Sequence, residues 1–284
     1  MRRPTLLPPL LLAALISIMA MMACAHSEKS GKRTLAVSIP PQAWLLEKIA
    51  GDNFDIEVIY RAGSDPETYE PTTRQIAALS RAEAIFTIGG LPFESNTLPR
   101  LNTEKTRIVT SAQNIERITG THSGGDDPHV WTTPANLLSI ARVMATELKK
   151  LDPDNAPLYD RNMAALALQL DSADNSFHHR LDSIPSCDFL IWHPSLSYYA
   201  REYGLSQHPL QVEGKEASPR QLAERLRAAK EAGVATVVVE QSHDPQKVLS
   251  AADETGIRNR VEIDLMSRDI ISELRKLTDG ISRR

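Results

Sequence analysis

The sequence predicts an α/β protein with two open-sheet lobes that are joined by one long helix. Three observations lead to this fold class. Short apolar runs alternate with segments of helical period, this alternation is found both before and after the middle of the chain, and a long amphipathic segment separates the two series. A chain of 284 residues is long enough for two medium-sized lobes.

The first lobe is expected over residues 34–152. Its expected strands are 34–39, 55–60, 82–89 and 107–111, and its expected helices are 44–50, 73–80 and 134–150. Pro134 suits the first turn of the last of these helices, where a missing N–H costs nothing.

A single helix is expected to link the lobes over residues 153–184. Apolar residues recur there at spacings of three and four, which places them on one helical face. They are Tyr159, Met163, Leu166, Leu170, Ala173, Phe177, Leu181 and Ile184. At about 1.5 Å per residue such a helix spans roughly 40 Å. We therefore expect a rigid spine along both lobes and no large closure when a ligand binds.

The second lobe is expected over residues 185–284. Its expected strands are 188–193, 209–213, 234–240 and 260–265. One helix should end at Tyr203, one should cover 218–232, and one should begin at Pro245. Ser218 is a good N-cap for the middle helix, and Pro219 suits its first turn.

The N-terminal segment 1–23 is typical of a secretory signal. Arg2 and Arg3 precede an apolar run that ends at Ala23, directly before Cys24. We expect Cys24 to begin the mature chain and to carry a lipid, with residues 24–33 as a flexible tether. The expected location is the cell envelope, facing the periplasm or the exterior. An uncleaved membrane anchor is the alternative for this run of about 18 residues.

Charge and cysteine content exclude several other classes. Without Arg2 and Arg3, 30 basic side chains face 36 acidic ones, which leaves a formal charge of −6 and disfavours nucleic acid as a partner. Once Cys24 is lipidated, only Cys187 remains, so no disulfide within the chain is expected.

Four loops place metal-binding residue types at the ends of expected strands. They are 63–71, 126–131, 191–195 and 261–267, and they carry Glu67, His129, His193 and Asp264. Open α/β sheets bind ligands beyond the carboxyl ends of their strands. Imidazole nitrogen and carboxylate oxygen together suit first-row divalent metals, whereas calcium prefers oxygen and structural zinc usually shows paired cysteines. The sequence thus predicts a metal site in the cleft between the lobes.

From Thr34 to the C-terminus the chain resembles the zinc and manganese solute-binding proteins of ABC transporters. The resemblance depends on GSDPETYEP (63–71), which is similar to Gly-x-x-Pro-His-x-Tyr-Glu-Pro. It also depends on Asp-Pro-His-x-Trp at 127–131, on a strand ending in His193 before YYAREYGL, and on SPRQLAE at 218–224. The resemblance implies two lobes joined by one long helix, with the metal between them. It also implies a monomeric protein that hands the metal to a transporter permease.

The resemblance further implies that His129, His193 and Asp264 are metal ligands. Glu67 departs from the family, which usually has His there, so we expect a carboxylate ligand at this position, or else the loss of one ligand. Zinc is the expected metal because His193 is typical of zinc-binding members. Manganese or iron is the alternative, since two imidazoles with two carboxylates would suit them too.

Three further residues are expected near the metal. Trp131 and Trp192 flank the two histidines and should wall the site or pack in the core. Glu240 should hydrogen-bond to a ligand histidine or be an ordinary loop acid. The remaining histidines are expected at the surface: His26, His122, His178, His179, His208 and His243.

Two other functions remain open. A zinc hydrolase would need a water on the metal and Glu67 as general base, but no His-Glu-x-x-His or Gly-x-Ser-x-Gly motif supports it. We therefore predict that the protein is not an enzyme. A surface adhesin is the third possibility, and no repeat or stalk favours it.

Overall fold

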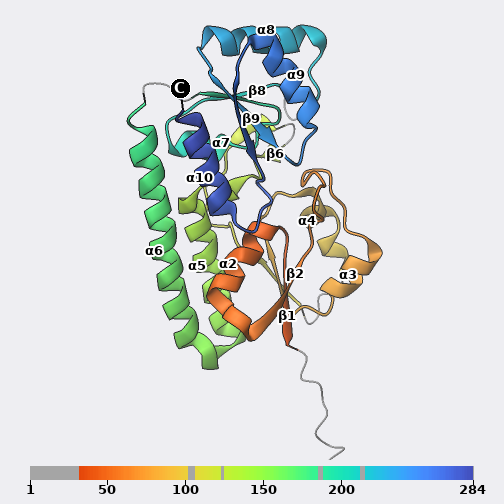
Figure 1. Ribbon diagram of the computed structural model, residues 1–284. Helices are drawn as coiled ribbons and strands as arrows, with labels where there is room; N and C mark the ends of the chain where they lie inside the picture. The colour runs from red at the N-terminus through yellow and green to blue at the C-terminus, as the bar shows by residue number, and fades with distance from the viewer. Residues whose placement is uncertain (1–31, 102–105, 123–124, 185–187, 212–214, 284) are drawn as a thin grey trace, which may run out of the picture. The chain divides into compact units, whose positions relative to one another are not determined.

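The structure is a computed structural model that describes residues 32–101, 106–122, 125–184, 188–211 and 215–283 (Figure 1). The predicted signal segment 1–23, Cys24, almost all of the predicted tether and Cys187 lie outside the described residues. Residues 33–284 form one compact unit, and the description below concerns this unit. Within the described residues, no helix combines the length and the apolar character needed to cross a membrane.

Each lobe contains one parallel four-stranded sheet, as predicted. The order in the first sheet is β2 (Phe54–Val58), β1 (Arg33–Val37), β3 (Ala84–Thr87) and β4 (Arg107–Thr110). The order in the second is β10 (Asn259–Ile263), β9 (Thr236–Glu240), β7 (Phe189–Ile191) and β8 (Gln207–Pro209). The strands can be numbered along the chain within each lobe, and the second sheet can be read from β8 to β10. Both sheets then have the strand order second, first, third, fourth. The chain therefore builds the same winding twice.

Helices cover both sheets. The first lobe has α2 (Pro40–Ala50), α3 (Thr73–Leu79), α4 (Pro92–Asn96) and α5 (Pro134–Leu151), with 3₁₀ turns η1 (Gly51–Asn53), η2 (Leu98–Arg100) and η3 (Val130–Thr132). An antiparallel ribbon of β5 (Thr119–His122) and β6 (Gly125–Asp126) precedes η3. The turn η4 (Pro153–Asn155) follows α5, and the second lobe has α7 (Ser197–Glu202), α8 (Pro219–Glu231), α9 (Pro245–Thr255) and α10 (Ile270–Ile281).

The helix starts follow from local chemistry. Ser218 caps α8 as predicted, because its hydroxyl accepts a hydrogen bond from the backbone N–H of Gln221 and Pro219 fills the first turn. Thr133 caps α5 in the same way, ahead of Pro134.

The long helix α6 (Ala156–Leu181) links the lobes (Figure 1). Six of the eight predicted stripe residues are buried, and the other two, Met163 and Ile184, are partly buried against the same core. The helix packs on α2 and α5 of the first lobe and on α10 of the second. Asn162 donates a 3.0 Å hydrogen bond to the carbonyl oxygen of Ile49. Near the other end, Asp174 accepts one of 2.7 Å from the Tyr203 hydroxyl.

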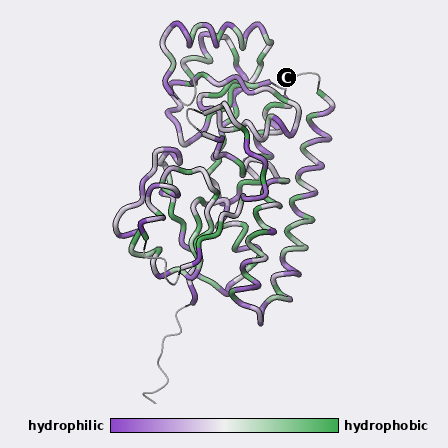
Figure 2. Tube along the Cα trace, turned by 180° about the vertical axis from the view of Figure 1, so that it is seen from behind, coloured by the Kyte–Doolittle hydropathy of each residue, from purple (hydrophilic) through white to green (hydrophobic). Residues whose placement is uncertain are grey.

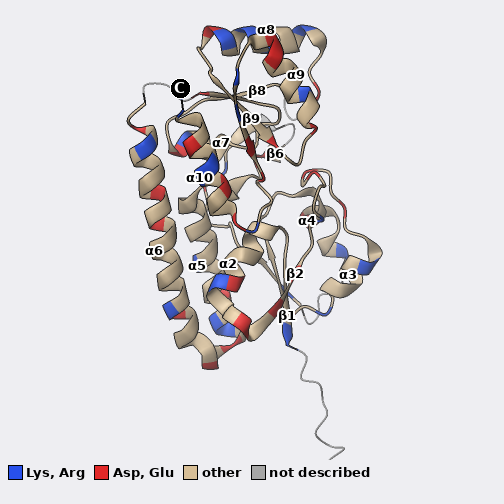
Figure 3. Cartoon of the chain, in the orientation of Figure 1, with Lys and Arg blue, Asp and Glu red and all other residues tan. Residues whose placement is uncertain are grey.

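One large core extends through both lobes. It includes Phe86 of β3, Leu170 of α6 and Ile263 of β10, and a smaller core lies between the second sheet and helices α8 and α9. Figure 2 shows hydrophobic residues along the central strands. In Figure 3, acidic and basic residues are interspersed along α6 and α8. Every residue of β3 and β9 is buried, as expected for central strands covered on both faces.

Some predicted elements differ from the structure. Of the strand expected at 209–213, residues 212–213 lie outside the described residues, and the strand that the structure describes here is Gln207–Pro209. The helix expected from Trp44 already begins at Pro40. Helix α10 was not predicted, although Ile270, Leu274 and Leu277 are buried at helical spacing.

Candidate metal centre

His129 is fixed by the residues on either side of it. Asp127 is fully buried, and its Oδ1 accepts the backbone N–H of His129 at 2.9 Å. The same oxygen lies 2.9 Å from Nδ1 of the His129 ring. The Thr132 hydroxyl donates to the carbonyl oxygen of His129 at 3.0 Å. The Asp-Pro-His segment thus holds the imidazole in one orientation before any ligand arrives.

His193 follows β7 by two residues and is 3% exposed. Its Nδ1 lies 2.7 Å from Oε1 of Gln211, and its Nε2 lies 3.2 Å from Oε1 of Glu67. Burial alone would lower the pKa of His193. The hydrogen bond and the negative charge of Glu67 outweigh it, with help from Glu240 and Gln211, and raise the pKa to about 9. Without metal, His193 is therefore held as a cation next to Glu67.

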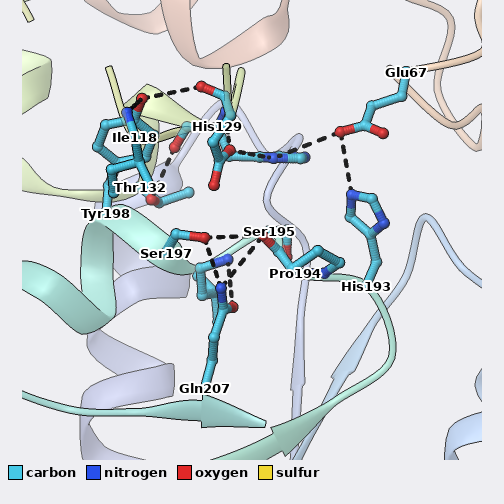
Figure 4. A network of polar contacts seen from close by, with 12 residues as sticks. Glu67, Ile118, His129, Thr132, His193, Pro194, Ser195, Ser197, Tyr198 and Gln207 are labelled. Carbon is cyan, nitrogen blue, oxygen red and sulfur yellow. Dashed lines mark hydrogen bonds and ion pairs between the residues drawn. The ribbon is translucent and has the colours of Figure 1, made fainter. Parts of the chain in front are cut away.

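Glu67 lies in the loop between β2 and α3 and reaches the two histidines (Figure 4). Its backbone N–H donates a 2.8 Å hydrogen bond to Oδ1 of Asp65, which shapes the turn. Its Oε1 lies 3.2 Å from His193 Nε2 and 3.9 Å from His129 Nδ1. A carboxylate oxygen from the first lobe therefore lies beside a histidine from each lobe.

These three side chains are a group that could hold a metal ion. One ligand atom from each of Glu67, His129 and His193 can be chosen so that all lie within 4.8 Å of one another. Around tetrahedral zinc, bonds of about 2.0–2.2 Å separate neighbouring ligand atoms by roughly 3.4 Å. Small side-chain adjustments would therefore close the group around one ion.

Asp264 lies outside this group. It follows β10, and its Oδ1 accepts the backbone N–H of Met266 at 2.9 Å. It borders a cavity of about 170 Å³ together with Tyr60 and Gly63. Burial raises the pKa of Tyr60 to about 12, with added effects of Asp264 and Asp65. Asp264 as a ligand stays a prediction.

The predicted neighbours of the metal lie in different places. The ring of Trp131 is fully buried, with its centroid 5.2 Å from that of His129. Trp192 instead packs against the smaller core and lies under Lys247, whose Nζ is 5.6 Å from the Trp192 ring centroid. Glu240 is buried at the end of β9 and accepts a hydrogen bond from the Ser195 hydroxyl.

Sequence reasoning missed three residues that contact the centre. Asp127 and Gln211 each bond to a ring nitrogen of a histidine, and Asp127 stands inside the Asp-Pro-His motif that drew attention to His129. His243 was expected at the surface, which was wrong. It is half-buried, and its ring centroid lies 4.9 Å from that of His193. Burial, opposed by Glu240 and reinforced by His193, lowers the pKa of His243.

A second group of possible ligands lies on α6 and α7. Asp174, His178 and Glu202 offer atoms within 4.8 Å of one another, and all three are partly or fully exposed. Nε2 of His178 lies 3.9 Å from Asp174 and 3.6 Å from Glu202. Exposed acidic groups are common without a metal ion, so we assign no site to this group.

Comparison with known proteins identifies close likenesses in sequence and fold. Residues 35–277 match the family model described as the periplasmic zinc-uptake complex component A. The zinc-binding lipoprotein AdcA of Streptococcus pneumoniae is 24% identical over 289 residues, covering 95% of this chain and 56% of AdcA. The chain thus spans about half the length of that relative. The manganese ABC transporter substrate-binding lipoprotein PsaA of Streptococcus anginosus is 27% identical, covering 87% of this chain and 86% of PsaA.

Solved structures agree. A crystal structure of ZnuA superposes with a TM-score of 0.82 at 36% identity, covering 89% of this chain and 98% of that one. The periplasmic zinc-binding protein TroA from Treponema pallidum gives a TM-score of 0.79 at 20% identity, with 89% and 98% covered, and shows the shared fold. The two-lobe fold with its long helix is therefore confirmed.

Proposed function

The chain belongs to the family of the periplasmic zinc-uptake complex component A, and on this premise we propose that it captures a divalent transition metal, zinc first, and delivers it to an ABC transporter. The proposal rests on one observation above all. Ligand atoms of Glu67 and His129 from the first lobe and of His193 from the second lie within 4.8 Å of one another, so donors from both lobes are close enough to bind one ion. Such a donor set suits zinc, while manganese and iron accept carboxylates as well.

The relatives support this role and leave the choice of metal to experiment. AdcA is described as zinc-binding, and PsaA as a manganese-transporter protein. Two imidazoles among the three grouped donors favour zinc over manganese, because manganese prefers oxygen.

Three grouped donors would also suit a catalytic zinc, which keeps a position open for water. The family membership favours capture and delivery over hydrolysis. Glu67 is itself part of the donor group, so it does not stand apart from the metal as a general base would.

Export and anchoring complete the proposal. We propose that Cys24 carries a lipid that holds the protein at the envelope, where it meets the transporter permease as a monomer. A Cys24→Ser variant should be recovered in the soluble extract of whole cells, while the wild type fractionates with membranes.

Metal analysis of the purified protein tests the central claim. Protein prepared without added metal should contain zinc, and calorimetric titration of the stripped protein should show tighter binding of zinc than of manganese. Glu67→Ala, His129→Ala and His193→Ala should each lose bound zinc, while His179→Ala, an exposed residue on α6, should keep it. Equal zinc in all five proteins would refute the site, and tighter binding of manganese would refute the preference.

A further inference from the structure

His243 lies beside the metal centre, although its neighbours in the sequence gave no reason to expect it there. It belongs to the turn 241–244, between the end of β9 and the start of α9. The backbone N–H of Gln241 donates to the carbonyl oxygen of Ile263 at 3.0 Å. At the other end of the turn, Asp244 caps α9 by accepting the N–H of Gln246 at 2.9 Å. The turn is therefore anchored on both sides of the imidazole.

The position of His243 follows from the strand order. Strands β7 and β9 are neighbours, and the connections of the sheet reverse direction between them. His193 follows β7 and His243 follows β9, so both lie beyond the carboxyl ends of these two strands. This is the switch point at which open α/β sheets bind their ligands.

The spacing of the rings is that of ligands to a common ion. Zinc–nitrogen bonds of about 2.0–2.1 Å place the centroids of two imidazoles on one tetrahedral ion roughly 5 Å apart. The His129 and His193 centroids are 5.2 Å apart, and those of His193 and His243 are 4.9 Å apart. His193 thus has two other imidazoles at this spacing, those of His129 and His243.

We propose that His243 is a further ligand of the captured metal, in the position for which the sequence predicts Asp264. This rests on the proposed function. Asp264 already accepts the backbone N–H of Met266, and neither it nor His243 belongs to the group whose atoms lie within 4.8 Å. The His243 side chain must therefore turn toward His129 as the ion is bound.

The consequence is a change in the donor set. With His243 the metal meets three imidazoles and the carboxylate of Glu67, whereas with Asp264 it would meet two imidazoles and two carboxylates. Imidazole suits zinc and carboxylate suits manganese, so His243 makes the site more selective for zinc.

The test compares the affinities of the full chain for zinc and manganese, measured by competition with a chelator. His243→Ala and His243→Gln should weaken zinc binding more than about 100-fold, beyond the 10- to 100-fold typical of outer-shell partners. The affinity for manganese should change less, so the ratio of the zinc affinity to the manganese affinity should fall. The exposed control His179→Ala should stay close to wild type. Thermal unfolding of the metal-free variants verifies that each one folds. If His243→Ala does not fold, His243→Gln still allows the test.

The visible absorption of cobalt bound in place of zinc distinguishes a ligand from a residue with only a structural role, because it changes when a ligand of the metal is replaced. A four-coordinate cobalt ion absorbs strongly in the visible range, and His243→Gln should weaken or shift this band. If both His243 variants keep wild-type zinc affinity and the wild-type cobalt spectrum, the proposal is overturned while the metal-binding function stands. If the wild type itself binds no metal, the proposed function fails as well.

Discussion

The indole N–H of Trp131 donates a 2.9 Å hydrogen bond to the carbonyl oxygen of Leu265, which lies 134 residues later in the other lobe. Tyr198 makes a second connection of this kind. Its hydroxyl donates to the carbonyl oxygen of Asp127 at 3.0 Å and accepts the N–H of Ile118 at 3.1 Å. Both connections lie next to metal-binding loops, so the two lobes are already held together around the centre.

Metal binding should therefore leave the separation of the lobes almost unchanged. The helix α6 packs against both lobes, and the Trp131 and Tyr198 bonds would have to break for a hinge to open. Small-angle scattering of the stripped and the zinc-loaded protein should give the same radius of gyration within error. A clear contraction on adding zinc would contradict the rigid-spine interpretation.

Asp127 should control metal affinity through His129. In Asp127→Ala the ring loses the carboxylate that orients it, so zinc affinity should fall about 10- to 100-fold. Asp127→Asn keeps an oxygen that can accept the backbone N–H of His129, so it should recover most of the affinity. Competition titrations check both values. If the asparagine variant is as weak as the alanine variant, the negative charge of Asp127 is required and the orienting role is not sufficient.

The metal-free protein should lose stability in alkaline solution because of His193. Its pKa is raised from the ordinary 6.5 to about 9, so the folded state favours the protonated ring. The stabilisation is fully present below pH 6.5 and is lost as the pH rises through 9. It amounts to about 3 kcal/mol at most. Urea unfolding across this window measures it.

The matched control is Glu67→Gln, which removes the charge that raises the pKa of His193. Its stability should change much less over the same pH range. Parallel curves for wild type and variant would show that another group titrates.

Glu94 should be important for the stability of the first lobe. Its Oε1 accepts the Ser38 hydroxyl and the N–H of Ile88, and its Oε2 accepts the N–H groups of Gly89 and Leu91. Burial raises its pKa, while these donors favour the charged form. In Glu94→Gln the amide nitrogen cannot accept, so buried N–H groups lose their partner at a cost of about 2–4 kcal/mol.

Chemical denaturation of the metal-free protein measures this loss. Glu70→Gln serves as control, because Glu70 is exposed and, among the described residues, accepts one side-chain hydrogen bond, from Thr97. Its unfolding free energy should stay within about 0.5 kcal/mol of wild type. An equal loss in both variants would mean that the buried contacts of Glu94 are not the cause.

The sequence was informative where local chemistry decides the structure. The stripe on α6 and the Ser218 cap of α8 depend on spacing and on neighbouring residues, and both are found as predicted. The strand expected at 209–213 is found earlier because the apolar run alone does not determine which residues pair with β7.

The candidate site was predicted only in part, for a similar reason. Glu67, His129 and His193 each stand beside a proline in a recognisable loop, and the structure brings them together. Gln211 and His243 reach the centre through the order of strands in the second sheet, which no local pattern encodes.

The shared core has a consequence for unfolding. Since Phe86, Leu170 and Ile263 belong to one apolar cluster, we expect that neither lobe can unfold while the other keeps its packing. Calorimetry should show a single cooperative transition. A cation bound at the centre would then protect the whole molecule from heat, shifting that transition as a unit through mass action.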